Sequence, residues 1–473
     1  MMATLACAVA LAGCPNGAKG PNDVRPPRAQ KWYERAQAEY RVANLEAAHD
    51  SARHALDLVP QDEQVRVLAA QVALARLEYA EVLRLLRGVE TSAASALRGR
   101  AYWYQGDLER AADELDKLLA DPEVTDKWAK SITKLARRGV GRNPFDITIT
   151  EGRLAAVQMA RVAPGVPLYI VPLEIDGDKA LALVSTGTAE VMVDGATRRE
   201  PSWVSLRFAK RLEVKDVPAL TQDLSAISNQ LGAPIKALLG ANLLRHLNVT
   251  LDHRGRQFVV RDFVPPPPPV ASRVDVHYLR GGGMVLDSAF GEDGQLRTSL
   301  FVDTAMGHTV ALDAGGWKKL GIEAGKLPVA DGSDDGKLRV GSIPLLQFGA
   351  FKLPQISAVY GPPIDRVERE LDIDIDGVVG AGLLSKFRLT FSDGGRVLWV
   401  EQTPELTPSS AAPLPPGPLH TQPIGPGLPT GPGLGGLPGG EPVPILPPLS
   451  DKPPLSPLPP PPELPKSGGK DNF

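Results

Sequence analysis

Two short stretches, Leu183-Val184-Ser185-Thr186-Gly187 and Phe301-Val302-Asp303-Thr304-Ala305, decide the fold of this 473-residue chain. In each of them a run of apolar residues, typical of a buried strand, enters a three-residue turn. Each is followed later by a closing motif of two aliphatic residues and a glycine, Leu238-Leu239-Gly240 in the first case and Val378-Val379-Gly380 in the second. The sequence therefore contains one β unit twice.

The duplication extends beyond these motifs. Residues 239–244 match residues 379–384 at an offset of 140, and the match continues through Val249-Thr250-Leu251 against Leu389-Thr390-Phe391. Between the copies, the five prolines 265–269 lack backbone N–H donors and favour an extended conformation. These observations predict three segments: a first β lobe over 150–263, a linker over 264–272 and a second β lobe over 273–402.

This arrangement resembles the pepsin and retropepsin aspartic proteases, whose lobes each combine a strand, an Asp-Thr-Gly turn and a later hydrophobic-hydrophobic-glycine strand. The resemblance extends from Pro167 to Gln402. It implies a two-lobed, all-β domain. In that family two carboxylates, one from each lobe, share a proton, so that one acts as a base toward water while the other donates to the scissile carbonyl.

The resemblance places Asp303 and Ser185 at the two catalytic positions. A serine hydroxyl does not ionise near neutral pH, and no histidine base is evident beside Ser185 in the sequence. The hydroxyl can therefore neither share the proton nor generate the nucleophilic water. Asp176, Asp178 and Asp194 do not stand at the turn position. Half of the catalytic pair is missing from the first lobe.

The residues beside the catalytic positions indicate that the lobes still pair. Thr186 and Thr304 stand where the family joins its two turns through threonine hydroxyls. Gly187 keeps the third residue of the turn, whereas Ala305 replaces it and adds a methyl group where the backbone turns tightly. The resemblance therefore predicts an intact connection between the lobes.

The first lobe is also shorter than the second. From Ser185 to Gly240 the chain advances 55 residues, against 77 from Asp303 to Gly380. This difference predicts that a flap-like hairpin is shortened or missing in the first lobe. Four residues are candidates for lining an inter-lobe cleft or, equally, for ordinary core and surface positions: Trp203, Arg207, His308 and Tyr360.

The residues before the β lobes have a helical pattern that repeats. Leu45-Glu46-Ala47-Ala48, Leu77-Glu78-Tyr79-Ala80 and Leu108-Glu109-Arg110-Ala111 recur at spacings of 32 and 31, close to the roughly 34 residues of a tetratricopeptide repeat. The segment 29–140 resembles such an array of about three helix pairs. Either a concave groove for a peptide or a spacer packed on the next domain fits this pattern. The first copy carries typical residues of that family at four positions: Trp32, Ala48, Ala55 and Pro60.

The N-terminus carries a short apolar run, residues 3–12, that ends in Leu11-Ala12-Gly13-Cys14. Ten residues are too few to span a bilayer, and small residues before the cysteine fit a secretory signal. The stretch resembles a bacterial lipobox, which implies a signal peptide over 1–14, lipidation of Cys14 and a linker over 15–28. We therefore expect an exported, membrane-anchored lipoprotein of the cell envelope that faces the periplasm or the exterior. An ordinary apolar terminus or a simple cleaved signal are the alternatives.

The C-terminal segment, residues 403–473, contains 23 of the 46 prolines of the chain. Such a composition does not support a packed core and predicts a disordered tail. The tail fits a spacer or, through its proline runs, a ligand of polyproline-binding modules.

Composition excludes several classes of function. A net charge of −3 and an aromatic content of 5% provide no basic surface for nucleic acid. The two cysteines, Cys7 and Cys14, provide no disulfide framework for the folded part, and the seven histidines form no paired metal-ligand motif. We therefore expect no nucleic-acid partner, no metal and no cofactor.

These observations predict a multidomain α + β protein: a tetratricopeptide-like helical array, a two-lobed retropepsin-like domain and a proline-rich tail. The missing carboxylate at Ser185 favours a non-catalytic envelope lipoprotein that binds polypeptides or partner proteins through the inter-lobe cleft and the helical repeats. The alternative is an active aspartic endopeptidase in which Asp303 pairs with its counterpart across a homodimer of second lobes.

Overall fold

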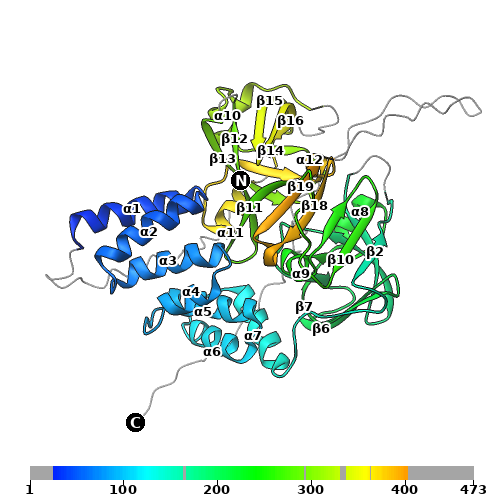
Figure 1. Cartoon of the computed structure of the whole chain (residues 1–473), viewed down its shortest axis with the longest axis horizontal. Helices are drawn as coiled ribbons and strands as arrows, with labels where there is room; N and C mark the ends of the chain where they lie inside the picture. The colour runs from blue at the N-terminus through cyan, green and yellow to red at the C-terminus, as the bar shows by residue number, and fades with distance from the viewer. Residues whose placement is uncertain (1–24, 163–166, 292–293, 331–336, 363, 403–473) are drawn as a thin grey trace, which may run out of the picture.

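The computed structural model describes residues 25–162, 167–291, 294–330, 337–362 and 364–402. The expected signal peptide 1–14, the expected lipidation site Cys14 and the segment 403–473 lie outside the described residues. Two β lobes stand side by side, and a row of helices lies along one side of both (Figure 1). Among the described helices, none has the length and apolar composition needed to cross a bilayer.

The helical array is the N-terminal part, and within the described residues it consists of seven helices. Three successive pairs, α1 with α2, α3 with α4 and α5 with α6, are followed by α7. Buried alanines let neighbouring helices approach closely, and polar side chains cap five of the N-termini. The helices are α1 (Pro27–Arg41), α2 (Leu45–Leu58), α3 (Glu63–Ala75), α4 (Tyr79–Leu85), α5 (Ser92–Gln105), α6 (Leu108–Leu119) and α7 (Lys127–Gly139).

The first lobe is built on a seven-stranded sheet in the order β1-β7-β5-β8-β4-β3-β6. Its strand β4 runs parallel to β8, which carries the first closing motif. The elements are β1 (Asp146–Ile149), β3 (Ile170–Ile175), β4 (Asp178–Val184), β5 (Val191–Asp194), β6 (Ser202–Phe208), β7 (Leu212–Gln222), β8 (Ile235–Leu239), α8 (Ser225–Leu231) and α9 (Ala241–His246).

The second lobe repeats this plan, with β13 parallel to β17 in place of β4 and β8. The core of the second lobe is formed by side chains that are buried at alternate positions or in continuous runs along its strands. The elements are β11 (Ser272–Leu279), β12 (Gly283–Phe290), β13 (Leu296–Asp303), β14 (Val310–Leu312), α10 (Ala314–Lys319), η1 (Ala324–Lys326), β15 (Arg339–Phe348), β16 (Phe351–Tyr360), α11 (Ile364–Leu371), β17 (Gly377–Gly380), α12 (Ala381–Leu384), β18 (Phe387–Ser392), η2 (Asp393–Gly395) and β19 (Val397–Gln402).

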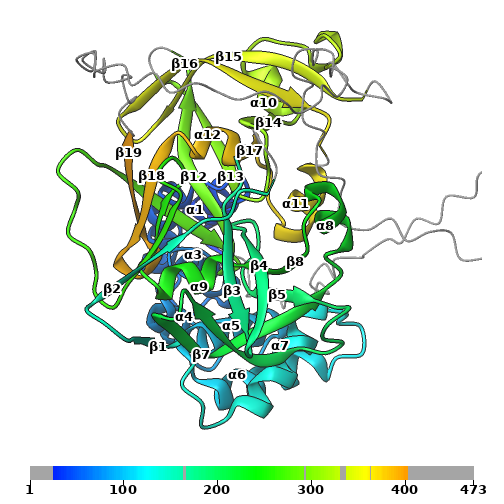
Figure 2. The same cartoon turned by 90° about the vertical axis from the view of Figure 1, so that its right-hand side faces the viewer.

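A continuous sheet joins the two lobes, and its strands β18 and β19 are labelled at the left of Figure 2. Strands β2 (Leu154–Gln158), β9 (Thr250–Asp252) and β10 (Gln257–Arg261) extend the second lobe's sheet in the order β19-β18-β9-β10-β2. At the junction β9 pairs with β18, and the hydroxyl oxygens of Thr250 and Thr390 lie 2.8 Å apart. These two threonines are equivalent in the duplicated sequence, so an approximate two-fold axis passes between them.

The first lobe has a β-hairpin over 202–222, against 339–360 in the second lobe, which corrects the expectation that a flap-like hairpin is shortened or missing in the first lobe. Strands β6 and β7 form it, as β15 and β16 form its counterpart in the second lobe. The extra length of the second lobe instead includes α10 and η1, inserted between β14 and β15. Strand β1 also joins the first-lobe sheet four residues before the boundary expected at 150, because its residues pair with β7.

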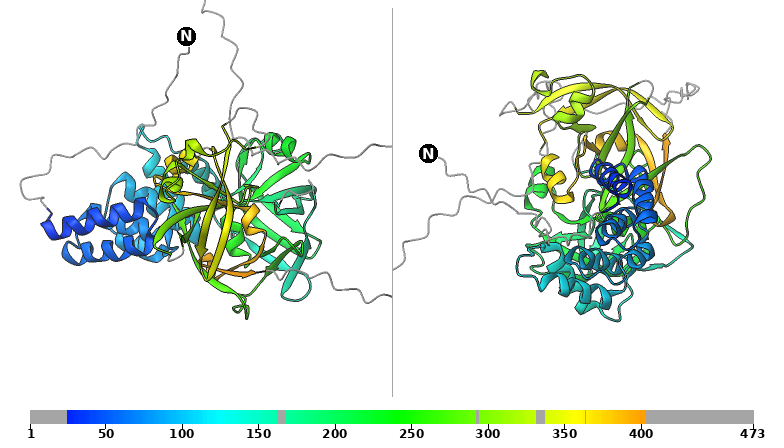
Figure 3. Two further views of the ribbon diagram at one scale, coloured as in Figure 1. Left: turned by 90° about the horizontal axis from the view of Figure 1, so that it is seen from above. Right: turned by 90° about the vertical axis from the view of Figure 1, so that its left-hand side faces the viewer.

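The helical array packs against both lobes (Figure 3). At one end Arg41 forms an ion pair with Asp374 of the second lobe at 3.1 Å. At the other end the indole N–H of Trp203, in the first lobe, donates to the backbone carbonyl of Leu135 at 3.0 Å. The array thus spans the junction between the lobes, the arrangement expected of a spacer packed on the next domain.

Candidate functional site

The two turns singled out in the sequence meet where the two lobes contact each other. Strand β4 ends at Val184, paired with Leu239, and β13 ends at Asp303, paired with Gly380. Both strands are buried between neighbours, and the backbone N–H of Ser185 donates to the carbonyl of Leu239 at 3.0 Å. Because each turn follows a strand locked to its closing motif, the side chains of the turns have fixed positions.

Thr186 and Thr304 join the turns by four hydrogen bonds in two equivalent sets. Each backbone N–H donates to the other threonine's hydroxyl oxygen at 3.1 Å. Each hydroxyl in turn donates to a carbonyl of the opposite lobe: Thr186 to Val302 at 2.9 Å and Thr304 to Val184 at 2.8 Å. The two sets differ by no more than 0.1 Å, so the approximate two-fold axis also passes between these residues.

The structure brings Ser185 and Asp303 together. The Ser185 hydroxyl donates to Oδ1 of Asp303 at 3.3 Å, and the backbone N–H of Ala305 donates to the same oxygen at 2.9 Å. Ser185 is 2% exposed, whereas Asp303 is half-buried. Burial raises the pKa of the Asp303 carboxyl, and hydrogen bonds from Ala305, Ser185 and Gly187 oppose that rise.

This geometry provides one titratable group where the two-acid mechanism needs two. The Ser185 hydroxyl can donate to or accept from a bound group, but it holds no negative charge with which to activate water. Two first-lobe aspartates are engaged elsewhere: Asp194 pairs with Lys236 at 2.7 Å, and Asp176 pairs with Arg198. Asp303 is therefore the acid that the turns place at this site.

Three glycines of the turn and closing motifs lie where any side chain would collide with neighbouring atoms. A Cβ atom at Gly187 would lie 2.6 Å from Cγ of Asp303. Cβ atoms at the closing glycines Gly240 and Gly380 would lie 2.2 Å and 2.4 Å from the backbone carbonyl oxygens of Glu190 and His308. The glycines of both motifs thus serve close packing around the two turns.

The four candidate lining residues have different environments. Trp203 packs against Gly139 of the helical array, and Arg207 forms an exposed ion pair with Glu174 at 3.3 Å. His308 lies in the loop after the second turn, where burial lowers the pKa of its ring. Tyr360 pairs with Arg339 at the end of β16. Of these four residues, only His308 belongs to a segment next to the turns.

Sequence reasoning missed a buried glutamate beside the first turn. Glu190, 2% exposed, accepts hydrogen bonds at Oε1 from the indole N–H groups of Trp103 and Trp128, at 3.2 and 3.4 Å. Burial raises the pKa of Glu190, while Asn242, the two tryptophans and Arg245 oppose the rise. A charged residue directly before the apolar strand β5 was the available signal. Glu190 fastens the helical array to the loop that follows the Ser185 turn.

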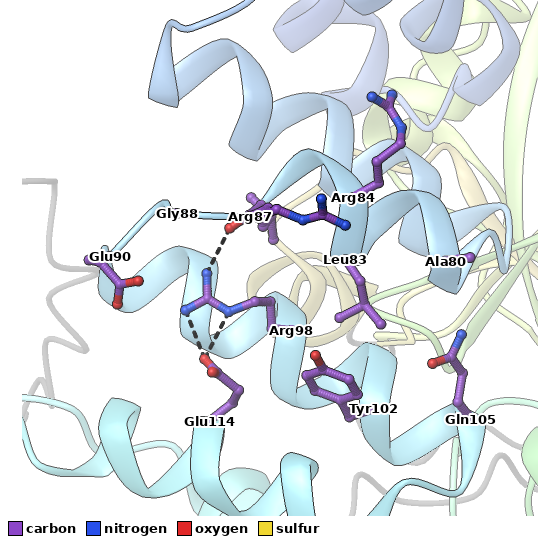
Figure 4. A pocket seen from close by; sticks show the side chains of 11 residues that line it. Ala80, Leu83, Arg84, Arg87, Gly88, Glu90, Arg98, Tyr102, Gln105 and Glu114 are labelled. Carbon is purple, nitrogen blue, oxygen red and sulfur yellow. Dashed lines mark hydrogen bonds and ion pairs between the residues drawn. The ribbon is translucent and has the colours of Figure 1, made fainter.

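The helical array has a cavity of its own, of about 410 Å³, among α4, α5 and α6 (Figure 4). Its buried guanidinium, that of Arg98, bonds Glu114 at 2.9 Å and the carbonyls of Leu86 and Val89 at 3.0 and 2.6 Å. These internal bonds give Arg98 a structural role. Within the described residues, no group of three or more His, Cys, Asp or Glu side chains is placed to hold a metal ion.

Two solved structures that match this chain are aspartic proteases. A retropepsin-like aspartic protease from Rickettsia conorii matches with a TM-score of 0.21 and 18% identity, over 28% of this chain and 90% of that protein. An aspartic proteinase from Irpex lacteus matches with a TM-score of 0.34 and 10% identity, over 54% of this chain and 99% of that protein. No protein-family model and no curated protein matches the sequence.

Proposed function

We propose that this protein is a non-catalytic, retropepsin-like binding protein that holds a polypeptide between its two lobes. The observation that supports this proposal is the hydrogen bond between Ser185 and Asp303 within a complete set of inter-lobe threonine bonds. The connection between the lobes is retained, and the second acid is replaced. Such a combination fits a protein that binds a polypeptide between its two lobes and does not hydrolyse it.

The Ser185–Asp303 pair offers hydrogen-bonding groups to a peptide backbone. Asp303 is half-buried, so part of its side chain is open to solvent. In its protonated form the carboxyl donates to a peptide carbonyl, and in its ionised form it accepts from a peptide N–H. Binding of a main chain needs only these hydrogen bonds, whereas hydrolysis also needs a water activated by a second carboxylate.

The helical array supports this role by bridging the lobes. It is tied to the second lobe through the ion pair of Arg41 with Asp374, and to the first lobe through Glu190 with Trp103. Arg41 lies at the end of α1 and Trp103 in α5, so the two contacts tie different parts of the array to the two lobes and restrain movement of one lobe against the other. We assign the array the function of fixing the lobe spacing, and the cavity among α4, α5 and α6 adds a second surface for a protein partner.

We place this activity at the cell envelope, on a lipid anchor at Cys14. The support is the apolar run that ends in Leu11-Ala12-Gly13-Cys14. Cells fed a fatty-acid analogue are expected to label the wild-type protein and to leave a Cys14→Ala variant unlabelled. Equal labelling of both proteins contradicts the anchor.

The decisive experiment mixes the purified protein with a peptide library over acid to neutral pH. We expect no new peptide ends, and we expect enrichment of bound peptides. Asp303→Ala is expected to weaken the binding of the enriched peptides about tenfold, because it removes a carboxyl group that hydrogen-bonds the peptide. The matched control, Asp275→Ala, changes an exposed acid of β11 and leaves binding intact. Cleavage that stops with a pepstatin-type inhibitor and with Asp303→Asn contradicts the proposal.

A further inference from the structure

We infer that Ser185 and Ala305 are a matched pair, in which the methyl group of Ala305 occupies space that a carboxylate at position 185 would need. This inference deepens the proposed function, on which it rests, by naming a second residue that keeps the site free of a second acid. It follows from the approximate two-fold symmetry of the turns and from one close contact.

The symmetry of the turns is given by their hydrogen bonds. The reciprocal N–H to hydroxyl bonds of Thr186 and Thr304 are equal at 3.1 Å, and the equivalent threonines 250 and 390 meet on the same axis. Position 185 is therefore equivalent to 303, and position 187 is equivalent to 305. Any contact between residues 187 and 303 has a counterpart between residues 305 and 185.

The contact between Gly187 and Asp303 leaves no room for a side chain. A Cβ atom at position 187 would lie 2.6 Å from Cγ of Asp303 and 2.9 Å from each carboxylate oxygen. These distances are far below the 3.5–4.0 Å of an ordinary carbon contact. An aspartate at 303 thus requires glycine at 187.

At the counterpart contact the third turn residue has a side chain, and the residue opposite it is smaller than aspartate. Position 305 carries a Cβ atom, and Ser185, which the symmetry of the turns places opposite it, has a single γ atom in place of a carboxylate. Ala305 is 8% exposed, and its backbone N–H is bound to Asp303. Its neighbour Thr304 is held by bonds to Thr186 and Val184. Ala305 therefore cannot move aside without breaking the connection between the lobes.

The two substitutions depend on each other. Glycine in place of Ala305 is compatible with either serine or aspartate at 185, but alanine is compatible only with the smaller residue. The Ser185→Asp change alone consequently cannot rebuild the two-acid site. Both Ser185→Asp and Ala305→Gly are required.

The test is a double-mutant cycle with Ser185→Asn, which has the shape of aspartate without its charge. We expect Ser185→Asn to lower the melting temperature by several degrees and Ala305→Gly to lower it slightly, because glycine adds freedom to the unfolded chain. In the Ser185→Asn background Ala305→Gly is expected to raise the melting temperature. The control Ala350→Gly, in the exposed turn between β15 and β16, should have one effect in both backgrounds.

A reversed cycle keeps the inference testable if Ser185→Asn does not fold. Gly187→Ala is expected to destabilise the protein, and Asp303→Ser is expected to relieve that loss in the double variant. Additive effects in both cycles overturn the matched pair while leaving the proposed function intact. Peptide cleavage by the wild-type protein would overturn the proposed function and would leave the coupling of Ser185 with Ala305 unchanged.

Discussion

Thr186 and Thr304 connect the two lobes through hydrogen bonds that are equivalent on the two sides of the axis. Both threonines are 1% exposed, so neither can exchange its partner for water. Each hydroxyl serves as acceptor for the opposite N–H and as donor to an opposite carbonyl. Removing one hydroxyl therefore leaves a donor and an acceptor of the other lobe buried without partners.

We predict that Thr186→Val lowers the free energy of unfolding by about 3 kcal/mol, because each buried polar group left unpaired costs roughly 1–3 kcal/mol. Valine keeps the shape of the side chain, so packing changes little. Thr186→Ser keeps the hydroxyl and should lose about 1 kcal/mol for the missing methyl group. Denaturant unfolding measures both, and the exposed Thr197→Val is the control. Equal stability of Thr186→Val and Thr197→Val contradicts the role of the threonine bonds.

The raised pKa of Asp303 predicts how the stability of the protein depends on pH. Burial disfavours the ionised carboxylate in the folded state, so the folded protein binds the proton more tightly than the unfolded chain. Wild-type stability therefore falls as pH rises above the ordinary aspartate pKa of about 4, and the fall ends above the raised pKa.

Asp303→Asn cannot ionise and lacks this dependence. We expect its stability relative to wild type to rise over the same pH window and to be constant below and above it. Thermal unfolding of both proteins at a series of pH values measures the difference. A difference that stays the same from acid to neutral pH contradicts a raised pKa. An NMR titration of the Asp303 carboxyl checks the direction of the shift independently.

The two turns could be predicted from the sequence, because each one directly follows an apolar strand and the motif occurs twice. Ser185 and Asp303 each follow an apolar strand, and the second copy of the motif shows which position faces which. Two copies of one β unit imply an approximate axis, and the residues nearest that axis must meet. The proximity of Ser185 and Asp303, and the threonine connection, were therefore open to prediction.

Other features depend on contacts that the sequence does not encode locally. Trp103 and Glu190 are 87 residues apart, and nothing near either residue indicates the other. The difference in length between the lobes led to a wrong prediction about the hairpin of the first lobe. A length difference does not reveal which connection between strands is shorter. The shortened part is the connection from β5 to β6, and the hairpin is kept. The steric dependence of Ala305 on Ser185 likewise needed the distance from Gly187 to Asp303.

Glu190 provides a test of how the helical array is attached. We predict that Glu190→Ala lowers the free energy of unfolding by about 3 kcal/mol, because it leaves the indole N–H groups of Trp103 and Trp128 without an acceptor and Arg245 without a nearby negative charge. Glu190→Gln keeps an acceptor oxygen and should lose less. Unfolding followed by tryptophan fluorescence reports on this interface directly.

The control for this experiment is Glu200→Ala, which removes an exposed ion pair with Arg138 at 3.1 Å. Its effect should stay within about 0.5 kcal/mol. Limited proteolysis provides a second readout, since a detached array should be cut first in the segment between α7 and β1. A Glu190→Ala protein as stable and as protease-resistant as Glu200→Ala would show that the array is held by other contacts.

The alternative of an active homodimer makes an opposite prediction about assembly. Pairing Asp303 with its counterpart in a second molecule requires the surface that the first lobe already covers through Thr186 and through the β9–β18 junction. We therefore predict that light scattering gives the mass of one chain over a wide range of concentration.

Variants that weaken the hydrogen bonding between the two lobes provide a stricter test of the homodimer. If dimers of second lobes were the active form, Thr186→Val combined with Thr250→Val would free the pairing surface and increase both the dimer fraction and peptide cleavage at acid pH. We expect the double variant to be less stable, because it removes buried hydrogen bonds on the axis, and to remain unable to cleave peptides. A dimer whose cleavage activity rises with concentration and disappears with Asp303→Asn would establish the enzyme in place of the binding protein.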